Sequence, residues 1–134
     1  MVLGAEGVQI GTRFALTEES SASPVFKEYC LSLGEGDTKL LLKKLAPTRL
    51  VKNAFREAVE KAEDSGATSE ELRTLLGRGR AKKGIFEGDL EEGELEIGQV
   101  SALINEMKPA REVIAELWED CVNTMESVKR MTSF

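Results

Sequence analysis

The sequence contains no histidine among its 134 residues, and it has only two cysteines, one tryptophan and one tyrosine. Without histidine, the chain lacks the side chain that most often transfers protons near neutral pH. Two isolated cysteines without histidine also give no ligand spacing that would suit a metal ion. We therefore predict no metal site, and we assign no catalytic residue within this chain.

Long apolar runs and an excess of basic residues are also missing. No stretch of about 18 or more apolar residues is present, so no membrane-spanning segment is predicted. The net charge of −6 disfavours a nucleic-acid partner, because phosphate binding needs a basic face. Residues 1–7 lack the basic and apolar regions of a signal peptide. We expect a cytoplasmic protein in which Cys30 and Cys121 are reduced, buried thiols rather than a disulfide.

The spacing of apolar and turn-forming residues in the first third of the chain predicts strands and one helix. A short strand is expected over 7–11 and a loop over 12–23. A helix is expected from Pro24 to near Leu33, with Ser23 as its N-cap. The segment 38–45 fits either a strand or a helix, and the turn residues around it favour a strand.

The rest of the sequence is typical of helices. They are expected over 50–62, 69–76, 81–86 and 93–107, and from Pro109 to near Met131. Thr68 and Glu71 have the spacing of a capping box at the start of the second of these helices. The last helix has the strongest apolar periodicity, which predicts that it faces the core. A helix that binds a partner or lies on a membrane surface is the alternative interpretation, which its acidic polar face disfavours.

Gly11 and Thr12 stand at the end of the first predicted strand. Glycine at this position lets the backbone approach a ligand closely. Consecutive amides beside a threonine hydroxyl can hydrogen-bond phosphate oxygens, and loops after the last strands of (β/α)₈ barrels often form such sites. From the residues alone, an ordinary turn between strand and loop remains the alternative.

Three blocks of sequence together resemble the nitronate monooxygenase family, formerly called 2-nitropropane dioxygenases, and its relative enoyl-acyl-carrier-protein reductase II. The first block is Gly-Ala-x-Gly-Val-Gln-Ile-Gly-Thr-Arg-Phe over 4–14, continued by 17–20 and by Pro24-x-x-Lys27. The second block is the stretch from Arg49 to Asn53. The third block is 84–89, followed by Gly93, by 98–100 and by the pair Leu103-Ile104. The blocks occur in family order, and the resemblance extends from Leu3 to near Val122.

The resemblance implies a TIM barrel that binds flavin mononucleotide (FMN) at the C-terminal ends of its strands. A whole (β/α)₈ barrel needs about 250 residues, so this α/β chain is expected to be a C-terminal fragment of one. It would be mostly α-helical as it stands and would form a single unit over 1–134. Residues 1–34 would supply the last barrel strand and the following helix, 35–92 a cap-like segment, and 93–134 the C-terminal helices.

The resemblance also implies an FMN-dependent oxidoreductase. Gly11 and Thr12 would bind the FMN phosphate, and Glu96 and Gln99 are candidates for lining the substrate pocket, although an exposed helix position is the plainer interpretation of Glu96. NAD(P)H would be a reductant, and the small-molecule substrate would be a nitroalkane or an enoyl thioester. Glu96 and Ile97 depart from the small or neutral residues that relatives often carry there.

The family's histidine and N-terminal flavin-binding strands have no counterpart in this sequence. The isolated chain is therefore not expected to be catalytically complete. It would need the missing N-terminal part of the barrel as its partner. The alternative is a non-catalytic helical homo-oligomer or interaction module derived from the same family.

Overall fold

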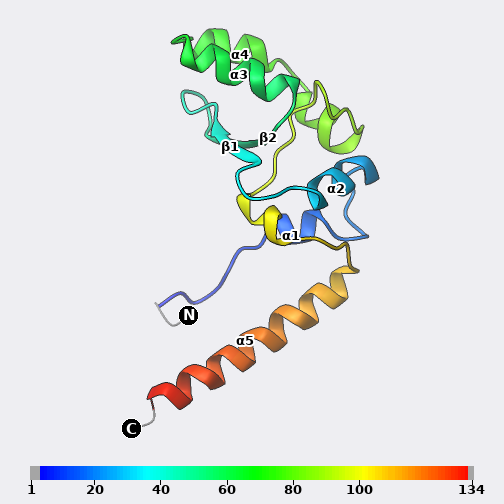
Figure 1. The fold of residues 1–134 in the computed structure, drawn as a ribbon, viewed down its shortest axis with the longest axis vertical. Helices are drawn as coiled ribbons and strands as arrows, with labels where there is room; N and C mark the ends of the chain where they lie inside the picture. The colour runs from blue at the N-terminus through cyan, green and yellow to red at the C-terminus, as the bar shows by residue number, and fades with distance from the viewer. Residues whose placement is uncertain (1–3, 133–134) are drawn as a thin grey trace.

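The computed structural model describes residues 4–132, and most of its regular structure is helical (Figure 1). The α-helices are α1 (Thr12–Ala15), α2 (Pro24–Leu31), α3 (Ala54–Asp64), α4 (Ser69–Leu76) and α5 (Ala110–Thr132). Two shorter turns are π-helical η1 (Lys82–Phe86) and 3-10 helical η2 (Gln99–Leu103). Strands β1 (Thr38–Leu41) and β2 (Thr48–Val51) pair antiparallel, with Leu40 opposite Arg49. The predicted helical character is confirmed, as is a strand in the ambiguous segment 38–45.

Three predicted elements are wrong, and each error involves contacts distant in sequence. The segment 7–11 forms no strand with any residue that the structure describes, and the loop after it contains α1. The helix predicted over 50–62 begins only at Ala54, because the residues before it belong to β2. The helix predicted over 93–107 is mostly extended chain with the short turn η2.

The extended chain before η2 lies beside β2. The amide of Val51 donates to the carbonyl of Leu95 at 3.0 Å, and the amide of Ile97 donates to the carbonyl of Arg49 at 3.3 Å. An isolated antiparallel bridge also joins Leu50 to Glu96. Backbone hydrogen bonds to β2 therefore replace the helical bonds that the sequence pattern predicted here.

The buried apolar residues form two clusters on either side of this small sheet. One centres on α2 and the other lies between the sheet and α3. The first contains Leu16, Ala22, Phe26, Cys30, Leu33, Val51, Leu95, Ile97 and Ile104. The second contains Leu41, Leu42, Leu50, Phe55 and Val59. β2 contributes one residue to each cluster, so this strand connects the two parts of the core.

Local signals at helix ends were predicted correctly. Ser23 caps α2 by accepting from the amide of Phe26, and Thr68 and Glu71 form the expected capping box on α4. One feature of α2 was not predicted. The buried ammonium group of Lys27 donates to the carbonyls of Thr17, Glu18 and Ser20 at 3.0 to 3.2 Å. This lysine of the first sequence block therefore holds the loop before α2 in place.

Within residues 4–132, most of helix α5 faces no core, contrary to the prediction from its periodicity. Val113 is buried, but Ile114 is 57% exposed and Trp118 is 70% exposed. Figure 1 shows that α5 projects from the body and that the N-terminal segment leaves the body toward the same side. The helix does carry an apolar face, and within the described residues most of that face is exposed to solvent.

Candidate functional site

Thr12 begins helix α1 directly after Gly11, which occupies the N-cap position. Its hydroxyl oxygen accepts a hydrogen bond from the backbone amide of Gly98 at 3.1 Å. This contact joins the first sequence block to the third across 86 residues. Because the oxygen accepts from Gly98, the hydroxyl proton of Thr12 remains available to donate to a ligand.

The backbone amides next to this hydroxyl are also available. The amides of Thr12, Arg13 and Phe14 make no hydrogen bond within residues 4–132, whereas the amide of Ala15 donates to the carbonyl of Gly11 at 2.9 Å. Unpaired amides at the start of a helical turn point along its axis and suit an anion. This cluster of donors could therefore accept an anion, and the role of Gly11 and Thr12 toward a phosphate stays a prediction.

A cavity of about 480 Å³ brings three of the four predicted site residues together. Gly11 and Thr12 come from the start of the chain, and Glu96 comes from the extended segment before η2. The backbone bridge between Leu50 and Glu96 holds the Glu96 segment at the sheet. Glu96 is exposed and lies in extended chain, so its predicted place in a helix is wrong, whereas its role stays a prediction.

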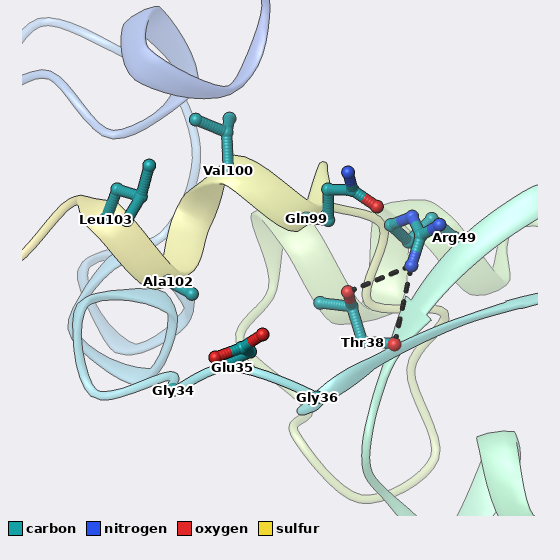
Figure 2. Close-up of a pocket in the computed structure, with 9 residues that line it drawn as sticks. All are labelled: Gly34, Glu35, Gly36, Thr38, Arg49, Gln99, Val100, Ala102 and Leu103. Carbon is teal, nitrogen blue, oxygen red and sulfur yellow. Dashed lines mark hydrogen bonds between the residues drawn. The ribbon is translucent and has the colours of Figure 1, made fainter.

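Gln99, the fourth predicted site residue, lines a different cavity of about 830 Å³ (Figure 2). Figure 2 shows its side chain beside that of Arg49. Arg49 donates from Nη1 to the hydroxyl of Thr38 at 3.2 Å and to its carbonyl at 3.4 Å. Arg49 also lines the smaller cavity, so this arginine lies between the two cavities.

Glu94 is a titratable residue of this region that the sequence did not single out. Burial raises the pKa of its carboxyl group to about 7, and the neighbouring Glu96 carboxyl contributes in the same direction. A buried carboxyl group beside another carboxylate favours the form in which a proton is held. The charge of Glu94, two residues before the cavity-lining Glu96, therefore depends on pH near neutrality. Two glutamates separated by one residue were the available signal, but the predicted helix would have placed them on different faces.

The glycines of the third block have a packing role. A Cβ atom added to Gly93 would lie 2.2 Å from the Cα of Gly84, so the two backbones touch directly. Gly88 has a φ of +79° and lies against Ser23. The Asp89 carboxylate accepts from the amides of Glu91 and Glu92. This part of the block therefore shapes the chain that leads to the cavity, and it does not line the cavity.

Other classes of site are not seen in residues 4–132. No group of three or more His, Cys, Asp or Glu side chains there could hold a metal ion. No helix in that range is long and apolar enough to cross a membrane. Cys30 and Cys121 are both free. Cys30 is buried as predicted, whereas Cys121 is partly exposed, so its predicted burial is wrong, because most of α5 has nothing packed against it within the described residues.

Comparison with known proteins decides the family. The family model for nitronate monooxygenase matches residues 1–120. The chain belongs to the nitronate monooxygenase family. A protein of Bacillus subtilis named "Probable nitronate monooxygenase" is 52% identical over 40 residues, which cover 30% of this chain and 12% of that protein. One of the same name from Staphylococcus saprophyticus is 31% identical over 110 residues, which cover 80% of this chain and 30% of that protein.

The fold is also that of a solved relative. FabK from Thermotoga maritima superposes with a TM-score of 0.85 and 32% identity, over 97% of this chain and 41% of that chain. A mutant of the same protein gives a TM-score of 0.78 with 31% identity, over 97% of this chain and 39% of that chain. The chain therefore spans less than half the length of each of these relatives.

Proposed function

We propose that this chain forms the C-terminal part of an FMN-dependent oxidoreductase and supplies part of its phosphate-binding site. The observation that carries the proposal is the cluster of donors at the start of α1. The Thr12 hydroxyl and the amides of Thr12, Arg13 and Phe14 are free to donate to an anion. Family membership supports the same assignment.

These residues would bind and orient the flavin phosphate through neutral donors. The amides cannot change protonation near neutral pH, so their contribution to phosphate binding would be constant there. FMN itself would supply the transfer of electrons from NAD(P)H or a substrate to an acceptor. Glu96 in the same cavity would add a carboxylate near the phosphate, and Gln99 would lie in the neighbouring cavity. Both are proposed to set the polarity of the pocket for a nitroalkane or an enoyl thioester.

The uncovered apolar residues support a chain that packs against further βα units. A cavity of about 470 Å³ is lined by Ile10, Val100 and Leu117, which are exposed and come from three separate segments. The backbone of 7–10 makes no hydrogen bond within residues 4–132, so this segment can still pair as a strand. A strand inside a closed sheet has a neighbour on each side. In the proposed enzyme, both edges of 7–10 would pair with barrel strands, and α5 would cover the outside.

A second candidate function is a non-catalytic oligomer or interaction module. The exposed apolar face of α5 favours it, because a helix of a second copy could cover Ile114 and Trp118. Size-exclusion chromatography with light scattering separates the two candidates. Ile114→Glu should abolish a dimer formed through this face. Asn123→Glu places the same charge at an exposed residue on the other side of the helix and should leave a dimer intact.

Flavin binding tests the main proposal. Titrations followed by flavin absorbance and fluorescence should show that the purified chain binds FMN more tightly than riboflavin, which lacks the phosphate. Thr12→Val should reduce this difference, because it removes the hydroxyl donor and leaves the backbone amides in place. Thr48→Val is the matched control, because Thr48 lines the same cavity but its hydroxyl already donates to the carbonyl of Ala46 at 2.8 Å. Equal affinities of the unmodified chain for FMN and riboflavin would refute the phosphate site.

A further inference from the structure

Gly98 contacts the Thr12 hydroxyl so closely that no larger residue fits while the hydroxyl keeps its position. A Cβ atom added to Gly98 would lie 2.5 Å from Thr12 Oγ1, well inside van der Waals contact. The backbone of Gly98 has φ −70° and ψ 154°, a conformation open to any residue. Glycine is therefore required here by the contact with Thr12, and the backbone conformation does not require it.

We propose that Gly98 is a positioning residue that aims the Thr12 hydroxyl at a bound phosphate. The amide of Gly98 donates to Thr12 Oγ1 at 3.1 Å, which fixes the oxygen and directs its proton elsewhere. The free amides of Arg13 and Phe14 lie in the same turn as Thr12. A fixed hydroxyl proton beside unpaired amides selects a ligand that only accepts hydrogen bonds, and a phosphate dianion is such a ligand.

The obvious alternative is that the contact only holds the chain before η2 against α1. The two roles predict different outcomes for alanine at position 98. A threonine side chain can rotate about one bond to a different rotamer. The rotamer that places the Cβ hydrogen of Thr12 where its oxygen was would relieve the 2.5 Å contact. The Gly98→Ala variant is therefore expected to fold normally, with the Thr12 hydroxyl turned away from the ligand. A purely structural role would instead show as a loss of stability without a specific loss of phosphate affinity.

This inference rests on the proposed phosphate site and adds a residue to it, so the experiment separates the two. Amide resonances of the ¹⁵N-labelled full chain are followed by NMR during titration with inorganic phosphate, with FMN and with riboflavin. In the unmodified chain, phosphate and FMN should shift the amides of Thr12, Arg13 and Phe14, and riboflavin should not. Gly98→Ala should weaken FMN binding about tenfold or more, as expected for losing one well-placed hydrogen bond to a charged group. It should leave riboflavin binding unchanged.

Two comparisons make the assignment specific to positioning. The double variant of Gly98→Ala with Thr12→Val should bind FMN no more weakly than Thr12→Val alone, because both changes remove the same donor. Gly34→Ala is the matched control, since its added Cβ would meet its nearest neighbour, Asp37 Oδ2, at an ordinary 3.6 Å. Melting temperatures of all variants, measured by circular dichroism, should stay close to that of the unmodified chain.

Each outcome decides one of the two ideas. Full FMN affinity in Gly98→Ala, or additive losses in the double variant, would overturn the role of Gly98 while the phosphate site stands. If phosphate and FMN shift no amide of α1 in the unmodified chain, the phosphate site fails and the role of Gly98 toward a phosphate fails with it. Hydrogen exchange of the Gly98 amide, which should speed up in Thr12→Val, then still shows whether the contact exists.

Discussion

Replacement of Asn53 by alanine is expected to cause a large loss of stability. This side chain caps α3 by accepting from the amide of Arg56 at 2.8 Å. Its amide nitrogen also donates to the carbonyl of Leu90 at 3.0 Å and to that of Gly93 at 2.8 Å. One polar side chain therefore ties the start of α3 to a segment about 40 residues later, next to the chain that forms the candidate site.

The expected magnitude follows from these three hydrogen bonds. Loss of an asparagine N-cap costs about 1 kcal/mol, and each further hydrogen bond contributes about 1 kcal/mol. Asn53→Ala should therefore lower the free energy of unfolding by about 3 kcal/mol, a large part of the roughly 5–15 kcal/mol that stabilises a domain. Urea denaturation followed by circular dichroism measures this loss.

Aspartate at the same position separates the cap from the two donated bonds. Asn53→Asp keeps the oxygen that caps α3, but it puts a second carboxylate oxygen against the carbonyls of Leu90 and Gly93. It should still cost about 2 kcal/mol. Asn105→Ala, at an exposed residue, should change stability by less than about 0.5 kcal/mol. A loss below about 1 kcal/mol for Asn53→Ala, or an Asn53→Asp variant as stable as the unmodified chain, would refute this account.

Three further predictions follow from individual contacts. Gly93→Ala should lower stability by more than about 2 kcal/mol, because its Cβ would lie 2.2 Å from Gly84 Cα; a melting temperature equal to that of the unmodified chain would contradict this. Glu94 has a folded-state pKa raised to about 7 from the ordinary 4.5, so the folded state holds a proton that the unfolded state releases, and stability falls as pH rises from 4.5 to 7. Glu94→Gln should remove that fall, on the order of 1–3 kcal/mol, and a urea midpoint difference that is the same at pH 5 and pH 8 would speak against it. Burial raises the pKa of the Cys30 thiol to about 12, so a disulfide reagent at pH 8 should label only the partly exposed Cys121 quickly. Cys121→Ser should abolish that fast reaction. Two fast thiols in the unmodified chain would show that Cys30 is accessible.

The candidate site could be predicted in part from the sequence. Gly11 and Thr12 were identified from their place after an apolar segment and from the family resemblance, and their free donors support that choice. The partner of Thr12 was not predicted, because nothing local to Gly98 indicates a residue 86 positions away. Gln99 follows Glu96 closely in sequence, yet the backbone directs the two residues to different cavities.

Sequence by itself determined the family and the local helix signals. Caps such as Ser23 and the Thr68–Glu71 box act over three residues, so the chain's own short-range chemistry decides them. The three family blocks are likewise read directly along the chain, and they placed it in the family that the comparison confirms.

Only the tertiary structure decided which apolar residues are covered and which glycines are required. Helical periodicity predicts an apolar face on α5, but whether that face is buried depends on what lies against it, and within residues 4–132 most of it is exposed. The segment 93–98 has apolar spacing that suits a helix, and hydrogen bonds to β2 made it extended. A backbone amide bonds to whichever acceptor the fold brings near it, and the distance between the two groups cannot be read from the sequence.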